Sequence, residues 1–441
     1  MIGYQQEQRS LTKEQKEAVG LLSIGTFLEY FDLMLYVHMA VLLNELFFPK
    51  SDPHTAAIYA AFAFCSTYLL RPFGALLFGW IGDNIGRKAT VIITTFMMAL
   101  SCFVMANLPT YAEVGLIATI LVTICRILQG LSSMGEFIGA QLYLTEITKP
   151  PIQYPVVALT SVFSILGGTF ALAIASFTTL HNLNWRIAFW FGAGVAIIGV
   201  IARTTLKETT DFADAKRRIK NILGDSKKDL KSNPIWKGIV EKNSDRKNII
   251  ALFFMDCAWP VCFYFAYVYC GNILKQDFGF SSEQIIHQNF IVSIIQLIGM
   301  LVLTFLSYKV YPPKIIKAKL CLFIIVMLLT PMLITKTSSH YTIFFIQCCI
   351  MLFACDYVPA RPITYTHISI FRRFTHSSFS YALSRVIMYI ITSFGLVYLV
   401  EFFGYIGLLI IMIPVVISYS FGVMHFGRLE KAAGNYFDKK N

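Results

Sequence analysis

Twelve apolar stretches of membrane-spanning length constrain what this 441-residue chain can fold into more than any other feature. A helix crosses a bilayer with about 20 predominantly apolar residues, and it satisfies its own backbone hydrogen bonds in lipid. The stretches form a group of six, a hydrophilic break and a second group of six: 20–46, 55–80, 89–107, 114–146, 156–180, 187–205, 249–274, 284–307, 314–335, 341–370, 377–400 and 404–426. The sequence therefore predicts an all-α integral membrane protein with twelve transmembrane helices in two six-helix halves.

The break between the two groups is the one long hydrophilic segment of the chain. It is rich in lysine and aspartate, so we expect a linker that lies at the membrane surface. The predicted organisation is an N-tail, an N-terminal six-helix bundle, a linker, a C-terminal six-helix bundle and a C-tail, at 1–19, 20–205, 206–248, 249–426 and 427–441.

Composition excludes a soluble fold. Hydrophobic residues make up 56% of the chain and charged residues only 14%, whereas soluble domains carry about 25% charged residues. The net charge of +12 would suggest nucleic acid in a soluble protein. Here the basic residues gather in the tails, the linker and alternate loops, and Lys319, near the start of the ninth stretch, is counted with the loop between spans 8 and 9. The positive-inside rule thus predicts cytoplasmic termini, with the bilayer and no nucleic acid as a partner.

The ten cysteines lie within or at the edges of the apolar stretches. No C-x-x-C pair occurs, and no histidine stands near a cysteine at the spacing of metal ligands. We interpret the cysteines as small packing residues, and we expect no metal site and no cofactor.

Ionisable side chains within the predicted spans are the first candidates for a functional site. Each costs at least about 2.5 kcal/mol near the bilayer centre, so such groups normally face the bundle interior. They pair with one another in a static frame, or they carry a function. The group consists of Glu29, Asp32, Arg71, Arg126, Glu136, Asp256, Asp356, Arg361 and Arg385.

Two carboxyl groups in the first span form the best candidate proton site. Glu29 and Asp32 are three residues apart and share one helix face. Two close carboxylates in an apolar bundle cannot both ionise cheaply, so one of them is expected to take up and release a proton. Asp32 lies nearer the midpoint of the span and is the favoured residue, with Glu136 and Asp256 as the next candidates.

Arginines and aromatic rings are the candidate solute ligands. Arg126 and Gln129 are one turn apart and place a cation and an amide on one face. The rings of span 7 suit an alkylammonium group, although packing explains any single ring equally well, and Pro260 permits a bend in that span. The predicted substrate-binding set is Arg126, Gln129, Arg71, Trp259, Tyr264, Asp356, Arg361 and Arg385.

Between spans 2 and 3 the chain reads GWIGDNIGRK, with the pattern G-x-x-x-D-x-x-G-R-K at Gly79, Asp83, Gly86, Arg87 and Lys88. This segment resembles the hallmark cytoplasmic motif of the major facilitator superfamily. Five further segments are similar to its metabolite:proton symporter family, which includes bacterial carriers of proline and glycine betaine, 2-oxoglutarate, citrate and shikimate: EYFD at 29–32, RPFG at 71–74, the segment 126–148, NWRIAF at 184–189 and LKETTDF at 206–212.

The resemblance implies a proton symporter in the bacterial cytoplasmic membrane, and we expect a monomer. It would move a small polar metabolite by alternating access, as two six-helix halves rock around a midplane site. A zwitterion such as proline or glycine betaine is the favoured solute, and a dicarboxylate or tricarboxylate such as 2-oxoglutarate or citrate is the alternative.

For the five motif residues the resemblance implies a gating role, in which Asp83 and Arg87 make contacts between helices in one conformation and break them in the other. A glycine-rich turn that only fixes topology would explain part of the same pattern.

Two other classes of protein stay open. An integral membrane enzyme would need a nucleophile and a base, but the chain contains neither H-E-x-x-H nor G-x-S-x-G. A transport-dead sensor would keep the fold, and the second half lacks a repeat of the motif because Tyr308 stands where its acid is expected.

Overall fold

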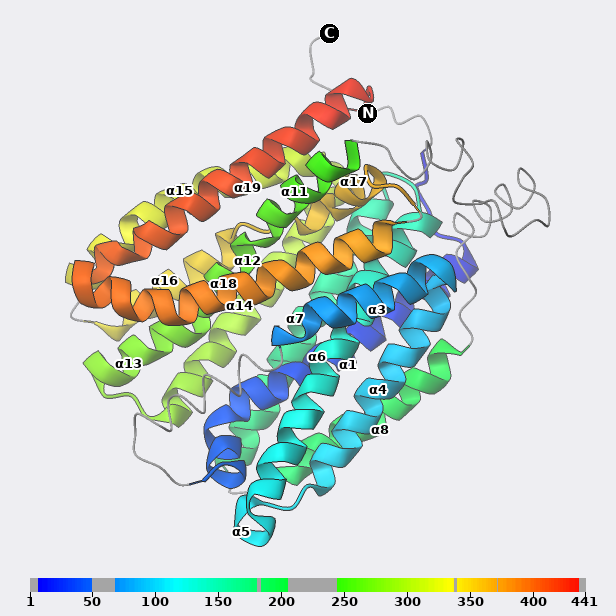
Figure 1. Cartoon of the computed structure of the whole chain (residues 1–441). Coiled ribbons are helices and arrows are strands. Elements are labelled where there is room, and N and C mark those ends of the chain that lie inside the picture. The colour runs from blue at the N-terminus through cyan, green and yellow to red at the C-terminus, as the bar shows by residue number, and fades with distance from the viewer. Residues whose placement is uncertain are drawn as a thin grey trace.

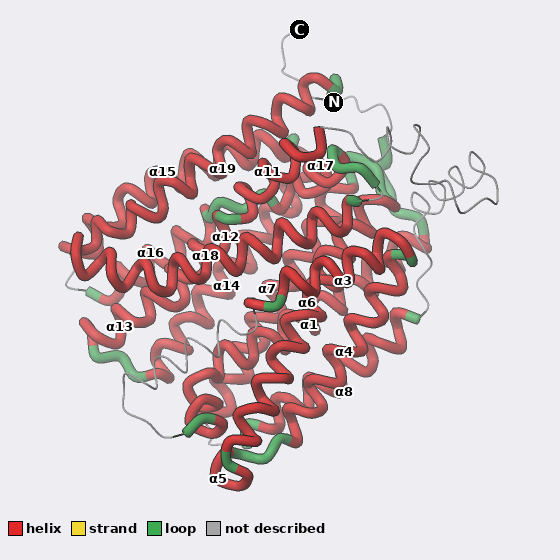
Figure 2. Tube along the Cα trace, viewed as in Figure 1, coloured by secondary structure: helices red, strands yellow, loops and turns green. Residues whose placement is uncertain are grey.

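The structure is a computed structural model that describes residues 7–49, 68–180, 184–204, 244–336, 339–370 and 372–435. Within these ranges it is a bundle of long helices that contains no strand (Figures 1 and 2). Most of the predicted linker 206–248 lies outside the described residues, and the described chain resumes at Ser244.

The first half of the bundle follows the first group of apolar stretches. Its helices are α1 (Lys13–Phe47), α3 (Arg71–Asn84), α4 (Arg87–Asn107), the short α5 (Tyr111–Val114), α6 (Leu116–Ile147), α7 (Gln153–Leu180) and α8 (Arg186–Arg203). Of the second predicted span, the structure describes the part from Tyr68 onward.

The second half contains two spans that are interrupted. Span 7 consists of α11 (Ser244–Asp256), α12 (Ala258–Phe263), the π-helix η1 (Tyr264–Tyr269) and α13 (Cys270–Phe278). Span 10 consists of α16 (His340–Phe353), the 3-10 turn η2 (Val358–Ala360) and α17 (Arg361–Thr366). The other elements are α14 (Ser282–Lys309), α15 (Pro312–Lys336), α18 (Arg373–Phe403), η3 (Gly404–Ile406) and α19 (Gly407–Ala432).

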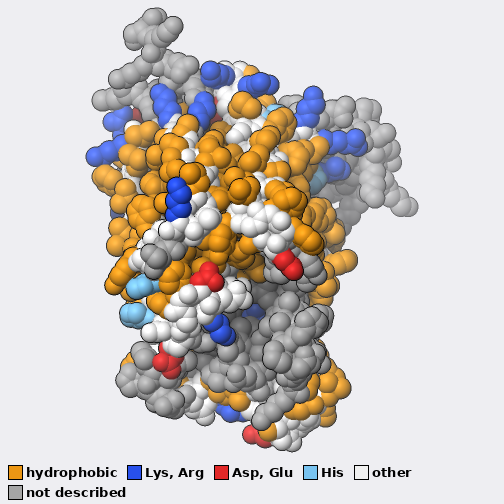
Figure 3. All heavy atoms as spheres, turned by 90° about the vertical axis from the view of Figure 1, so that its left-hand side faces the viewer, with side chains coloured by type: hydrophobic (Ala, Val, Ile, Leu, Met, Phe, Trp, Pro, Cys, Tyr) orange, Lys and Arg blue, Asp and Glu red, His pale blue; other side chains and the backbone are white. Residues whose placement is uncertain are grey.

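Nine stretches within the described ranges are long and apolar enough to cross a membrane. The helices α3, α8 and α18 occupy the positions of the other three predicted spans. Large apolar side chains cover the outside of the bundle, for example Phe305, Ile325 and Phe345, and Figure 3 shows them as a broad band. An apolar exterior is what lipid requires, so the all-α membrane fold is confirmed.

Each half has its own core, and few helices connect the halves. In the first half α1 packs along α7, and α4 lies against α6 and α8. In the second half α11 packs on α18 and α19, and α15 lies against α16 and α19. Between the halves, α7 lies against α14 and α3 lies against α18.

Both described chain ends lie at the same end of the bundle, here called the termini end. Gln8 bonds the loop between α6 and α7, where its N–H donates to the carbonyl of Pro150 at 2.8 Å. At the other end of the chain, Glu430 of α19 accepts a 2.6 Å hydrogen bond from Tyr311, the residue before α15. The opposite side of the bundle is called the far end below.

Candidate functional site

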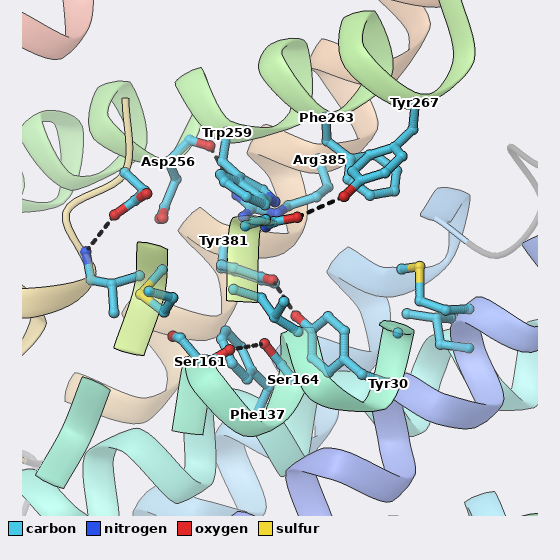
Figure 4. A pocket seen from close by; sticks show the side chains of 18 of the residues that line it. Tyr30, Phe137, Ser161, Ser164, Asp256, Trp259, Phe263, Tyr267, Tyr381 and Arg385 are labelled. Carbon is cyan, nitrogen blue, oxygen red and sulfur yellow. Dashed lines mark hydrogen bonds between the residues drawn. The ribbon is translucent and has the colours of Figure 1, made fainter. Parts of the chain in front are cut away.

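A cavity of about 110 Å³ lies between the two halves, near the middle of the helices. Its volume holds several water molecules or a small solute. Side chains from α1, α3, α6 and α7 of the first half face side chains from α11, α12, α14, α17 and α18 of the second half (Figure 4). In membrane carriers built from two half-bundles, the solute site lies at this kind of interface near the midplane.

Three aromatic rings close the cavity toward the termini end. The hydroxyls of Tyr30 on α1 and Tyr381 on α18 lie 3.0 Å apart and share a hydrogen bond across the two halves. The ring of Phe137 on α6 lies 5.3 Å from the first of these rings and 5.6 Å from the second, centre to centre. Figure 4 shows Phe137 close to the hydrogen-bonded hydroxyls of Tyr30 and Tyr381.

Pro260 leaves a backbone carbonyl of span 7 without its helical partner. Proline has no N–H, so the carbonyl of Asp256, four residues earlier, loses its helical partner. Arg385 of α18 donates to that carbonyl from Nη1 at 2.8 Å. The break in the helix therefore becomes a contact that holds an arginine at the cavity.

The π-helical turn η1 follows directly. Phe263, just before η1, and Tyr267, within it, both line the cavity. The Tyr267 hydroxyl donates to Gln296 of α14 at 2.8 Å. Trp259 also lines the cavity, as predicted, whereas Tyr264 is absent from the lining and packs against the core of the second half. Periodicity in a regular helix could not reveal which tyrosine faces inward, because the π-turn changes the register.

The prediction of one continuous helix over 341–370 is wrong. Helix α16 ends at Phe353, and residues 354–357 are not helical. Pro359 and Pro362 follow, and neither has an N–H to donate to the carbonyl four residues earlier, so a continuous α-helix cannot run through this segment with all its hydrogen bonds. The break brings Asp356 and Tyr357 to the cavity wall.

The two acids of the second half are buried and fully engaged. The Asp256 carboxylate accepts hydrogen bonds from Tyr357 at 2.7 Å and from Ser380 at 3.1 Å. The Asp356 carboxylate pairs with Lys319 of α15, with 2.7 Å between Nζ and Oδ2, and also accepts the N–H of Val358. Both acids line the cavity.

Lys319 is a functional candidate that sequence reasoning missed. Its position near the start of an apolar stretch made it a loop residue under the positive-inside rule. The structure buries it inside the second half, with a side chain only 7% exposed. The sequence did contain a signal for Lys319: a buried Asp356 in span 10 requires a cationic partner.

Replacing Lys319 by methionine is expected to lower the free energy of unfolding by about 3–5 kcal/mol, because the buried Asp356 carboxylate would lose its counter-charge. Thermal unfolding of the purified protein measures this. The double variant Lys319→Met/Asp356→Asn should recover most of the loss, and Lys317→Met, at an exposed position of the same helix, should be neutral. A single variant as stable as the wild type would contradict the pairing.

Arg126, Gln129 and Asp32 form a buried relay inside the first half instead of lining the central cavity. Arg126 donates to the Gln129 oxygen at 2.9 Å, and the Gln129 amide donates to Asp32 at 2.7 Å. The cavity face of α1 carries Tyr30, whereas Asp32 faces α6. Glu29 is buried as well, at 1% exposure, and the side chain of Glu136 lies outside the described part of the structure.

Asp83 joins the two halves at the termini end. Sequence reasoning placed it in a loop, but α3 continues to Asn84, so Gly79 and Asp83 belong to its last turns. The buried carboxylate accepts the backbone N–H groups of Phe374 at 3.2 Å and Thr375 at 2.9 Å, and the Thr375 hydroxyl at 2.7 Å. It therefore caps the first turn of α18 from the other half.

The glycines of the motif permit this close approach. A Cβ at Gly79 would lie 2.7 Å from the Cα of Thr375, and one at Gly82 would lie 2.6 Å from the ring of Phe374. Gly86 has a φ of 149°, which suits glycine, and precedes α4. Lys88 is in the first turn of that helix, and the side chain of Arg87 lies outside the described residues.

Two more polar contacts cross between the halves near the termini end. Gln141 of α6 accepts from Arg361 Nη1 and from the Tyr365 hydroxyl, both at 2.9 Å. Arg373 of α18 lies 3.4 Å from Glu146 of α6. Sequence reasoning missed Gln141, because an amide in an apolar span carries no signal of its own until its partner is known.

A second pocket, of about 470 Å³, lies toward the far end. Ser176 of α7 and residues 283–291 of α14 line it, one to two turns beyond the parts of these helices that line the central cavity. Along α7 and α14 the lining thus continues from the central cavity toward the far end. The described halves meet at the termini end.

Comparison with known proteins agrees with this architecture. The sequence model of the Major Facilitator Superfamily matches residues 22–368. The inner membrane metabolite transport protein YhjE of Escherichia coli K12 is 34% identical over 234 residues, which cover 51% of this chain and 53% of that protein. The proline/betaine transporter of Salmonella typhimurium is 28% identical over 295 residues, 65% of this chain and 57% of that protein. The chain thus spans about half the length of the curated relatives it matches.

Solved structures share the fold at low sequence identity. The proton:xylose symporter XylE, bound to 6-bromo-6-deoxy-D-glucose, superposes with a TM-score of 0.70 at 14% identity, covering 95% of each chain. The transporter FucP in its outward conformation gives 0.67 at 14% identity, covering 95% of this chain and 99% of that one. The matched family model spans most of the described helices of both halves. This chain is a member of the major facilitator superfamily.

Proposed function

We propose that this protein is a proton-coupled symporter that moves a small polar metabolite across the bacterial inner membrane by alternating access. The observation that carries the proposal is the cavity between the halves, which charged side chains line and which is closed toward the termini end by contacts that join one half to the other. Such contacts have to break when the cavity opens to the opposite side. The family supports a carrier, and the relatives named as transport proteins support it further.

Two solute classes fit the cavity. Relatives named proline/betaine transporters favour a zwitterion, whose carboxylate would bind an arginine and whose ammonium would meet the rings of Trp259 and Tyr267. A dicarboxylate is the second candidate, and the excess of arginines in the cavity, Arg71, Arg361 and Arg385, favours it.

The proton has a natural place in the first half. Asp32 is buried and bonded to Gln129, which in turn bonds Arg126. A small shift of α6 against α1 would bring the guanidinium nearer to the carboxylate or take it away, and so release or admit a proton. Coupling follows if only the fully loaded or the empty carrier reorients.

Uptake into proteoliposomes tests the proposal. With the lumen more alkaline than the outside, a labelled solute should accumulate above its external concentration, and a protonophore should abolish the accumulation. Labelled proline, glycine betaine, 2-oxoglutarate and citrate, each tested as the solute, cover both solute classes. Failure to move any of them above empty liposomes would favour a membrane enzyme or a transport-dead sensor.

Both termini are expected on the cytoplasmic side. Exposed lysines and arginines gather at the termini end, which is the upper end of Figure 3: Lys13, Lys16, Lys149, Arg246, Lys247, Lys309, Lys314, Lys317, Arg428 and Lys431. The positive-inside rule places such an end in the cytoplasm. A reporter enzyme that is active only in the cytoplasm, fused after Asn441 or inserted near Lys228, should be active. An active periplasmic reporter at either place would reverse the orientation.

A further inference from the structure

Three buried arginines, contributed by both halves, line the central cavity. Arg71 begins α3 of the first half, and Arg361 and Arg385 lie on α17 and α18 of the second half. Each is at most 5% exposed. Among the residues that the structure describes, no carboxylate forms an ion pair with any of them.

The guanidinium groups of the two arginines of the second half both lie near the ring of Tyr381. The Cζ atom of Arg385 is 3.7 Å from the ring centre of Tyr381, and the Cζ atom of Arg361 is 5.8 Å from it. Arg361 donates a hydrogen bond from Nη1 to the side-chain oxygen of Gln141. Its Nε has no hydrogen-bond partner in the described structure. The guanidinium groups are therefore held by rings and neutral oxygens, which leaves N–H groups for a ligand.

Arg71 approaches the cavity from the opposite half. Its Cζ atom lies 4.2 Å from the ring centre of Tyr68, and that ring lies 4.5 Å from the ring of Tyr389 on α18. Its Nε and Nη2 atoms are buried and make no hydrogen bond with a described residue. Tyr389 follows Arg385 by one turn, so the aromatic pair places Arg71 beside the arginine face of α18.

The acids of the cavity do not balance these charges. Asp356 is already paired with Lys319 at 2.7 Å. Asp256 is bonded by two hydroxyl groups, and Arg385 bonds its backbone carbonyl instead of its carboxylate. Three arginines thus face one carboxylate that has no cationic partner of its own.

An excess of buried positive charge is unfavourable unless a ligand compensates it, since an unpaired buried ion costs several kcal/mol. The planar fork of arginine matches a carboxylate with two parallel hydrogen bonds. From these three arginines around one cavity, one contributed by the first half and two by the second, we propose that the solute is a short dicarboxylate, with one carboxylate on Arg71 and the other between Arg361 and Arg385.

Such a ligand would itself connect the two halves, and this proposal rests on the cavity being the solute site of the proposed symporter. A zwitterion suits the cavity less well. Its single carboxylate would compensate only part of the positive charge of the three arginines. The ammonium would also be repelled by the arginine charge that is left uncompensated.

Binding to the purified full-length protein tests the charge requirement without any transport. Isothermal titration calorimetry compares succinate with succinamate, in which an amide replaces one carboxylate at nearly the same size, and with glycine betaine. Succinate should bind about tenfold or more tightly than succinamate, the difference expected for one charge-assisted contact. Glycine betaine should bind more weakly than succinate.

Arg71→Gln should remove the preference, so that succinate and succinamate bind with equal affinity, and Arg385→Gln should weaken both. The matched control is Arg186→Gln, because Arg186 lies at the start of α8, outside the cavity, and bonds the carbonyl of Leu108. This control should keep the wild-type preference. Circular dichroism and gel filtration confirm that each variant is folded.

Two results would overturn the dicarboxylate: glycine betaine binding as tightly as succinate, or a preference for succinate that survives Arg71→Gln. Symport can fail separately. Succinate that binds with the predicted arginine dependence but is not taken up by proteoliposomes would refute the symporter and leave the ligand class standing. Uptake of proline or betaine without succinate binding would support the symporter and refute the dicarboxylate.

Discussion

Asp32→Asn is expected to abolish uphill accumulation of solute while sparing exchange of solute across membranes at equal pH. With one proton per solute, a gradient of one pH unit supports about tenfold accumulation, and the variant should stay at the external concentration. Exchange needs no net movement of protons, so its rate should change little. Labelled solute in proteoliposomes, with and without a pH gradient, measures both quantities.

The physical reason is the surroundings of the carboxylate. Asp32 is 2% exposed, and its Oδ2 atom receives the Gln129 amide at 2.7 Å. Asparagine keeps the size and can still accept this hydrogen bond, but it cannot exchange a proton. The variant therefore isolates proton exchange from packing.

Asp277→Asn is the matched control, since Asp277 is exposed at the end of α13. It should accumulate solute as the wild type does. If Asp32→Asn still accumulates solute and a protonophore still collapses the gradient, the proton binds elsewhere. Glu29, Glu136 and Asp256 would then be examined by the same pair of assays.

Asp83→Asn is expected to reduce the initial rate of transport about tenfold or more, with folding largely preserved. The carboxylate accepts three hydrogen bonds at the first turn of α18, and hydrogen bonds to a charged group contribute roughly 1.5–3 kcal/mol each. It also places a negative charge at a helix N-terminus, which is stabilising. Loss of the charge destabilises the state closed at the termini end, so that the carrier spends less time with its cavity accessible from the far end.

Thr375→Val provides a graded comparison. It removes the 2.7 Å hydroxyl donor but leaves both backbone N–H donors in place. Its transport rate should fall less than that of Asp83→Asn, and the double variant should be no slower than Asp83→Asn alone. Wild-type transport by Asp83→Asn would mean that the motif serves only topology.

The same contact shows how sequence and structure divide the information about the gate. The pattern of glycines, acid and basic residues at 79–88 predicted a gating motif, and Asp83 was its central residue. The sequence could not indicate that α18 would be the partner, because Thr375 lies 292 positions further along the chain. Nor could it indicate that the acid sits within α3 and acts as a cap for another helix.

The four intramembrane arginines also show what the sequence revealed and what only the structure revealed. Hydropathy alone marked all four intramembrane arginines as candidates, because each is too costly to leave in lipid. The structure turns Arg71, Arg361 and Arg385 toward one cavity and places Arg126 in a relay with Gln129 and Asp32. Lys319 was assigned to a loop, although it is the partner of a cavity acid.

The sequence by itself determined the membrane fold, the order of the helices and the short set of charged residues that must lie inside. It could do so because the free energy of placing a residue in lipid depends mainly on that residue and its near neighbours. The tertiary structure alone decided which of these residues share a cavity, which pair with one another and which end of the bundle is closed. Those properties depend on contacts between helices far apart in the chain, and on local breaks such as residues 354–357, whose effect on direction appears only when the helices pack.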